Sequence, residues 1–220
     1  MDYELLRILT FLSPFILAVG IGIGIYRYKT LEPIHRMLFY YLILCIVFDI
    51  MTRLPFLVWT TNLVFLVLFS LFELVFFYLL YLGVYSNKKN PILLIAVPLG
   101  IAYIVSELFY INFREPENFQ SYAKVVDTIC IMLMAIGYFF DRFRKPVSEL
   151  WFFFQENSVI LVCFSFYIVF FIPINFLIKG NTNGHLYLWL LHLFVTVGFY
   201  FYILVELWKN GRIRKQSPFG

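Results

Sequence analysis

The stretch MLFYYLILCIVFDIMTRLPFLVW, residues 37–59, decides the fold of this chain. It is almost entirely apolar, and a helix needs roughly 20 such residues to cross a bilayer core about 30 Å thick. Two charged residues, Asp49 and Arg53, lie inside it. Because a charge near the bilayer centre costs on the order of 3 kcal/mol, both residues need partners within the protein. The stretch therefore predicts a membrane-spanning helix that contains a polar site.

The composition of the whole chain favours a membrane protein. Of its 220 residues, 62% are hydrophobic and 14% are charged, and the mean hydropathy is +0.86. A soluble domain of this length has too few polar residues to cover so much apolar surface, whereas lipid solvates the outer face of a membrane bundle. The net charge of +4 is small and dispersed. We therefore expect the lipid bilayer as a partner and no nucleic acid.

Six further apolar windows have the length of a membrane span, and they lie near residues 5–26, 63–85, 92–111, 123–140, 158–178 and 185–208. The first window follows an acidic start, MDYE, and no small-residue cleavage site comes after it, so we expect it to remain as a span. Short connections force neighbouring spans to be antiparallel. The sequence predicts an all-α, polytopic integral membrane protein with one seven-helix domain over residues 1–220.

The basic residues predict the orientation of the bundle. With the N-terminus outside, the predicted cytoplasmic segments contain twelve Lys and Arg residues and the external side contains only Arg7, Arg114, Lys124 and Lys179. Cytoplasmic segments of membrane proteins are enriched in Lys and Arg, so this bias predicts an external N-terminus and a cytoplasmic C-terminus. We expect a multi-pass protein of the bacterial cytoplasmic (inner) membrane.

Several polar residues lie at or outside the predicted midplane, where they form a candidate ligand-binding site: Asp49, Arg53, Glu73, Glu107, Asp127, Asn175 and His192. Asp49 and Arg53 are four residues apart, so an ion pair within one helix is expected. Glu73 reaches a similar depth on the next helix, which predicts an Asp49–Arg53–Glu73 triad. The acids outnumber the bases, and an uncompensated carboxylate in a low dielectric binds a proton or awaits a cation.

A structural interpretation remains open for each of these residues. The charged network would then only fix helix packing, Glu107 and Asp127 would reach the outer interface, and His192 would be a packing residue. His35 is expected in a cytoplasmic loop, far from the other histidines. The cysteines, Cys45, Cys130 and Cys163, lack metal-ligand spacing. We therefore predict no catalytic residues, no metal site and no cofactor.

Glycines and prolines within the apolar segments predict how the helices pack and bend. Gly20 and Gly24 have the GxxxG spacing that permits close helix approach. Pro14, Pro98 and Pro173 lie within predicted spans and predict kinks. The seventh window has no lysine near its middle, which excludes a microbial-rhodopsin type of retinal linkage there.

Three aromatic-rich segments carry a resemblance to a known class of proteins: SLFELVFFYLLY in the third span, WFFFQENSVILVCFSFYIVFF at the sixth and LWLLHLFVTVGFYFYILVELW at the seventh. In these segments the chain resembles small bacterial seven-helix membrane proteins and the sensor modules associated with histidine kinases. The resemblance implies a sensory function. This sequence contains no kinase or output domain, so it also implies a cytoplasmic or membrane signalling partner.

The sequence thus favours a receptor-like or sensory bundle with an outward-facing polar cavity. The cavity would bind a small polar or cationic ligand, or a proton, and the bundle would signal to a partner, with homo-oligomers as a further option. Two alternatives stay open. One is a transporter of a small solute, coupled to ions or protons, and the other is an integral membrane enzyme acting on a lipid-like substrate. We favour a non-enzymatic role.

Overall fold

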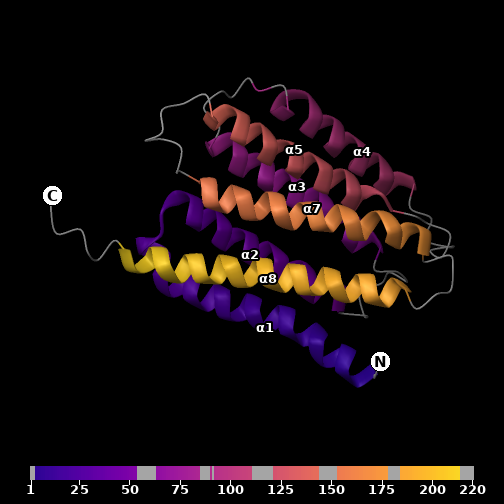
Figure 1. Ribbon diagram of the computed structural model, residues 1–220, viewed down its shortest axis with the longest axis horizontal. Coiled ribbons are helices and arrows are strands. Elements are labelled where there is room, and N and C mark those ends of the chain that lie inside the picture. The colour runs from indigo at the N-terminus through magenta and orange to yellow at the C-terminus, as the bar shows by residue number, and fades with distance from the viewer. Residues whose placement is uncertain are drawn as a thin grey trace. The chain divides into compact units, whose positions relative to one another are not determined.

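The computed structural model describes residues 3–53, 63–84, 90, 92–110, 121–143, 153–177 and 184–213 (Figure 1). At helix ends, the description of residues 3–9, 63, 174–177, 184–186 and 211–213 covers the backbone only. All the regular structure among these residues is helical, and seven of the helices are long and apolar enough to cross a membrane. For the described residues, the predictions of an all-helical fold and of seven apolar helices are therefore confirmed.

The long helices are α1 (Tyr3–Arg27), α2 (Pro33–Arg53), α3 (Leu63–Val84), α4 (Val97–Tyr110), α5 (Ala123–Phe143), α7 (Phe154–Leu177) and α8 (Gly184–Ile213). Their bounds lie close to the predicted windows. Helices α2 and α7 each begin four residues before the predicted start, at Pro33 and Phe154, and α4 begins five residues after it because η2 comes first. Proline suits the first helical position because its missing N–H would have no partner there. Residues 54–59, the rest of the predicted second span, lie outside the described residues.

The chain divides into two compact units. The first consists of Met1–Arg53 and Leu190–Gly220, and the second of Leu54–Trp189. The expectation of one seven-helix domain stays a prediction, and each unit is described by itself below.

In the first unit, α1 packs against α2 through its glycines. A Cβ atom at Gly20 would lie 2.8 Å from Leu42 Cδ1, and one at Gly24 would overlap the ring of Phe39. The two glycines therefore allow the close approach that their spacing predicted. The last turns of α8 contribute Trp208, whose ring lies 5.3 Å from the Arg27 guanidinium carbon of α1.

In the second unit, α5 is the central helix, and α3, α4 and α7 pack around it (Figure 1). Its buried positions recur at helical spacing along one side, from Lys124 and Asp127 through Ile131 to Tyr138 and Arg142. A single face of α5 thus carries both apolar and ionisable side chains into the interior of the unit.

The fourth span starts with a π-helical turn, η2 (Ile92–Ala96), directly before α4. Pro98 lies two residues later, and a proline lacks a backbone N–H and crowds the carbonyl of the preceding turn. A π turn is wider than an α turn, so it relieves this crowding. Asn90 begins the segment by accepting the Ile92 N–H with its side chain, at 2.9 Å. Pro98 predicted a kink in this span, and the structure shows a change from π-helix to α-helix directly before it.

Candidate functional site

Three ionisable side chains meet in the interior of the second unit, and we refer to Glu73, Lys124 and Asp127 as the charge cluster. The Lys124 ammonium of α5 forms an ion pair with Glu73 of α3 and another with Asp127 Oδ2, at 2.9 Å. The exposed fractions of Glu73, Lys124 and Asp127 are 1%, 3% and 0%. The cluster is therefore closed to solvent and joins α3 to α5.

Aromatic rings surround the ammonium on its other sides. Lys124 Nζ lies 4.9 Å from the ring centroid of Phe69 and 5.8 Å from those of Phe164 and Tyr167. At these distances the negative faces of the rings attract the cation. Helices α3 and α7 thus supply an aromatic wall on one side of the ammonium, and the carboxylates of Glu73 and Asp127 contact it on the other.

The local structure of α5 explains why its two charged residues meet. Lys124 and Asp127 are three residues apart in the first turns, so their side chains share a face. A cation near a helix N-terminus is disfavoured by the helix dipole, whereas Asp127 there is favoured. The carboxylates therefore have to hold Lys124 in place. The Thr128 hydroxyl donates to the Lys124 carbonyl at 2.6 Å and completes this turn.

The cluster has one carboxylate more than it has ammonium groups. With all three groups ionised, its net charge is −1. Asp127 Oδ1 is buried and makes no hydrogen bond within the part of the chain that the structure describes. A proton or another cation at this oxygen would neutralise the cluster.

Glu107 of α4 lies close to the start of α5. Its carboxyl is next to the Ser121 hydroxyl, the backbone N–H groups of Tyr122 and Ala123, and the Tyr103 hydroxyl. Only 7% of the residue is exposed. Neither oxygen completes a hydrogen bond of normal geometry among the described residues. The carboxyl is thus placed at the positive end of the α5 dipole without being fully fixed.

A second buried polar group, which we call the Asn157 network, ties the same helices further along. The Tyr81 hydroxyl of α3 donates to Asn157 Oδ1 of α7 at 2.6 Å, and Asn157 Nδ2 donates to the Ala135 carbonyl of α5 at 3.1 Å. Ala135 follows Asp127 by eight residues, about 12 Å along a helix. Arg142 donates to the carbonyl of Val84, the last residue of α3, at 3.3 Å. This network was not predicted from the sequence.

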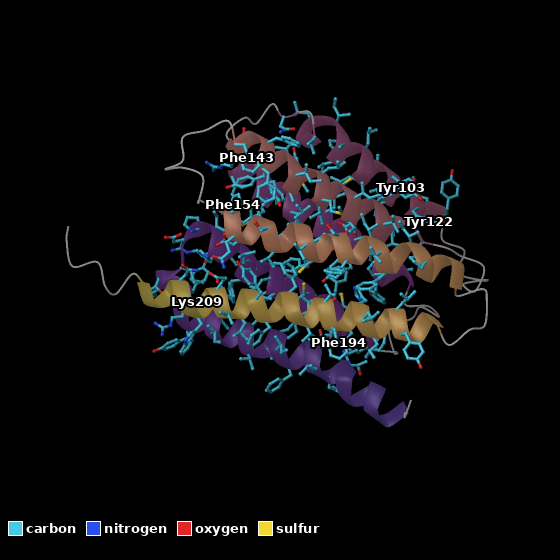
Figure 2. All side chains as sticks on the ribbon, viewed as in Figure 1. Tyr103, Tyr122, Phe143, Phe154, Phe194 and Lys209 are labelled. Carbon is cyan, nitrogen blue, oxygen red and sulfur yellow. The ribbon has the colours of Figure 1, made fainter. Side chains whose placement is uncertain are left out.

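Aromatic residues close the same end of the second unit. Phe153, which directly precedes α7, has a φ of 60° and is 3% exposed. Its ring lies 6.0 Å from that of Tyr81 and 5.5 Å from that of Tyr138. A bulky residue in the left-handed region is a strained backbone that packing must hold. Figure 2 shows Phe143 and Phe154 at this end of the unit and Tyr103 and Tyr122 at the opposite end.

The predicted Asp49–Arg53 pair is confirmed in the first unit. Arg53 Nε lies 2.7 Å from Asp49 Oδ2, and Arg53 Nη2 lies 3.2 Å from Asp49 Oδ1. The same Nη2 also donates to the Thr10 carbonyl of α1 at 2.7 Å. Glu73, the expected third member, belongs to the second unit and pairs there with Lys124. The triad as a whole stays a prediction.

The structure adds one basic residue to the site and corrects the expectation for another. Lys124, which we counted among the external charges, is buried between two carboxylates, and its side of the membrane stays a prediction. A signal for this position is present in the sequence, because Lys124, Asp127 and Thr128 fall on the same helical face as the apolar core positions that follow. His35 was expected in a loop, but it lies in α2 and is buried.

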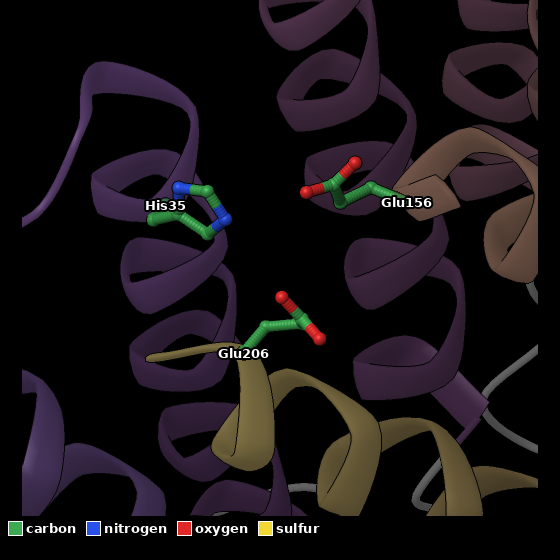
Figure 3. Close-up of side chains that lie close together, drawn as sticks. All are labelled: His35, Glu156 and Glu206. Atoms are coloured by element: carbon green, nitrogen blue, oxygen red, sulfur yellow. The ribbon is translucent and has the colours of Figure 1, made fainter. Parts of the chain in front are cut away.

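His35 belongs to a polar group of the first unit. Its Nε2 lies 2.8 Å from Asn210 Nδ2, which also donates to Glu206 Oε2 at 3.0 Å. The His35 ring also lies close to the Glu206 carboxylate, with a ring nitrogen and a carboxylate oxygen within 4.8 Å of each other (Figure 3). Residues of α2 and the end of α8 are thus tied by hydrogen bonds.

The remaining predicted site residues lie apart from the charge cluster in the chain. His192 is half-buried in α8, and the Thr196 hydroxyl lies 3.4 Å from its Nε2 and donates to its carbonyl at 2.8 Å. This local contact agrees with the packing interpretation of His192. The backbone of Asn175 is part of α7, and its side chain lies outside the described residues.

No protein-family model, no curated protein and no solved structure matches this chain significantly. The candidate site therefore rests on its own geometry.

Proposed function

We propose that this chain is a receptor-like membrane protein that senses protons through the charge cluster and signals to a partner. One observation carries the proposal: two buried carboxylates face a single buried ammonium. An uncompensated charge in a low dielectric is unfavourable, and the uptake of one proton removes it. The proton is favoured over the other predicted ligands because it needs no cavity, and the carboxylates are buried against Lys124, whose ammonium lies among three aromatic rings.

The orientation and the partner are proposals from the sequence. An external N-terminus and a cytoplasmic C-terminus in the bacterial inner membrane would place Glu73, Asp127 and Glu107 at or outside the midplane. The basic cytoplasmic segments and tail would then provide the surface that a signalling partner reads. The resemblance to sensor modules of histidine kinases supports this proposal, because such modules pass a change in the membrane to a separate output.

Proton binding is tested on the purified full chain in lipid nanodiscs by infrared difference spectroscopy during a pH titration. We expect acidification to add the absorbance of one protonated carboxyl. Asp127→Asn and Glu73→Gln should each remove or shift this band, and Asp141→Asn, further along α5, should leave it unchanged. A band that persists in the double variant E73Q/D127N would refute the proposal. Circular dichroism and size-exclusion chromatography show whether each variant is folded.

Flux measurements separate the sensor from the two alternatives. In proteoliposomes, wild-type protein and Glu73→Gln would be compared for the flux of protons and of methylammonium, a small cation. The sensor proposal expects no protein-dependent flux. A flux that Glu73→Gln abolishes would replace the sensor with a transporter, and a lipid product formed by the wild type alone would replace it with an enzyme.

A further inference from the structure

We infer that Glu107 is the residue through which protons reach the charge cluster. The inference rests on the proposed proton-binding function and adds to it a route and a direction of entry. It starts from the antiparallel packing of α4 on α5. A Cβ atom at Gly100 would meet Cys130 Sγ and Val126, and Glu107, two turns later on α4, lies at Tyr122 and Ala123.

This packing fixes the separation between Glu107 and the cluster along α5. Ala123 precedes Asp127 by one helical turn of four residues, which corresponds to about 6 Å. On α4, Gly100, Ile104 and Glu107 are all buried and share one face, which packs toward α5. A separation of one turn is short enough for one or two water molecules to bridge two polar groups.

The surroundings of Glu107 connect it to the surface. Tyr103, one turn earlier on α4, is 42% exposed, and Ser121 is half-buried. Their hydroxyl groups lie next to the Glu107 carboxyl. Glu107 therefore lies between groups at the surface of the unit and groups in its interior, as a carboxyl that receives and passes on protons must.

Each titratable group on the route can be named. Tyr103 and Tyr122 face Glu107 from α4 and from the residue before α5. At the cluster, Asp127 faces Lys124 on α5 and Glu73 on α3, Tyr167 of α7 contributes its ring, and Cys130 lies one turn further along α5. Glu107 and Asp127 are the two carboxyls for which a buried oxygen has no hydrogen bond of normal geometry within the described residues.

Among the described residues, side chains pack closely at the opposite end of the second unit. The Asn157 network and the rings of Tyr81, Tyr138 and Phe153 fill the space between α3, α5 and α7 there. Entry is thus one-sided. In the transfer step, the protonated Glu107 carboxyl releases its proton to a bridging water, that water releases a proton to the Asp127 carboxylate, and the Glu107 carboxylate takes a new proton from the surface.

The experiment separates the rate of proton uptake from its extent. After a rapid drop in pH, the infrared band of the protonated carboxyl is followed in nanodiscs holding wild-type protein, Glu107→Gln or Glu107→Asp. Loss of a general acid–base group slows proton transfer by roughly 100-fold, so Glu107→Gln should slow uptake to this degree. The final amplitude and the midpoint of the titration should be unchanged. Glu107→Asp keeps a carboxyl and should retain most of the wild-type rate.

Two further measurements decide the interpretation. Formate, a small weak acid, should restore the rate of Glu107→Gln, and Glu156→Gln, a half-buried glutamate of α7, should behave as wild type. An unchanged rate in Glu107→Gln, with the band still lost in Asp127→Asn, would overturn the relay and leave the proposed function standing. A band lost entirely in Glu107→Gln would also overturn it, because Glu107 would then be the binding site. A wild type without a titrating carboxyl would overturn the proposed function itself.

Discussion

The Lys124 ammonium lies 2.9 Å from Asp127 Oδ2 on its own helix, and it also pairs with Glu73 on α3. One side chain thus compensates two buried carboxylates that belong to different helices. Removing one partner from such a buried pair is strongly destabilising, whereas replacing the whole set with neutral groups is often tolerated. This asymmetry makes the cluster a sensitive target for mutation.

Lys124→Met should destabilise the protein strongly, because it leaves two buried carboxylates without a cation. Breaking a buried pair in this way costs about 3–5 kcal/mol. Thermal unfolding in detergent, followed by circular dichroism, measures the change as a lower Tm. The neutral triple variant E73Q/K124M/D127N should unfold close to the wild-type Tm. A single variant as stable as the wild type would show that the ion pairs contribute little.

Tyr81→Phe should weaken the second unit, because it leaves Asn157 Oδ1 buried without its hydroxyl donor. An unsatisfied buried polar atom costs about 1–3 kcal/mol. Tyr78→Phe, at a half-buried position of the same helix, is the matched control and should leave the Tm unchanged. Equal effects of the two substitutions would contradict the importance of the Tyr81–Asn157 hydrogen bond.

Gly24→Ala should loosen the packing of α1 on α2, since the added methyl group overlaps the Phe39 ring. Overpacking of this kind costs about 1–3 kcal/mol. Gly22→Ala serves as the control because a Cβ atom there meets nothing within 4 Å. The difference in Tm between the two variants, measured in the same detergent, tests the contact. A tolerated Gly24→Ala together with a destabilising Gly22→Ala would reverse the expectation.

The orientation can be tested with reporter fusions at the C-terminus. A cytoplasmic C-terminus predicts that a fused green fluorescent protein is fluorescent and that a fused alkaline phosphatase is inactive. The physical basis is the excess of Lys and Arg in the predicted cytoplasmic segments, which resist translocation. The opposite pair of activities would show that the N-terminus is cytoplasmic and that the predicted topology is inverted.

The sequence was sufficient to predict features that depend on local spacing. Runs of about 20 apolar residues located the helices, because the thickness of the bilayer dictates their length. The separation of four residues between Asp49 and Arg53 predicted their ion pair, since such residues share a helix face. Gly20 and Gly24 predicted close packing for the same reason. These features need no knowledge of which helices are neighbours.

The charge cluster depends on tertiary contacts, and the pairing of Lys124 with Glu73 and Asp127 was not predicted from the sequence. Lys124 lies near the start of an apolar window, where lysines commonly mark the membrane boundary, and we therefore counted it as external. Glu73 was predicted to join Asp49 and Arg53 of α2, and the ion pair that the structure describes for it is with Lys124 of α5. Glu73 and Lys124 are 51 residues apart in the sequence. Residue spacing along one helix carries no information about a pairing between two helices.

The aromatic closure at Phe153 was also beyond the sequence analysis, because a positive φ is a property of the folded backbone. Glu107 was located correctly near the end of its span, but its burial and its position at the start of α5 follow from the antiparallel packing of α4 on α5. Both carboxyls of the proposed proton route, Glu107 and Asp127, were therefore identified from the sequence, but their order along the route was not.

The position of Lys124 and Asp127 also bears on how the protein enters the membrane. A lone α5 would expose an ammonium and a carboxylate to lipid as it left the insertion machinery, and each charge is costly there. Helix α3, which carries Glu73, is synthesised earlier and offers the compensating carboxylate. The order of synthesis thus makes the compensating carboxylate of α3 available before α5 is complete.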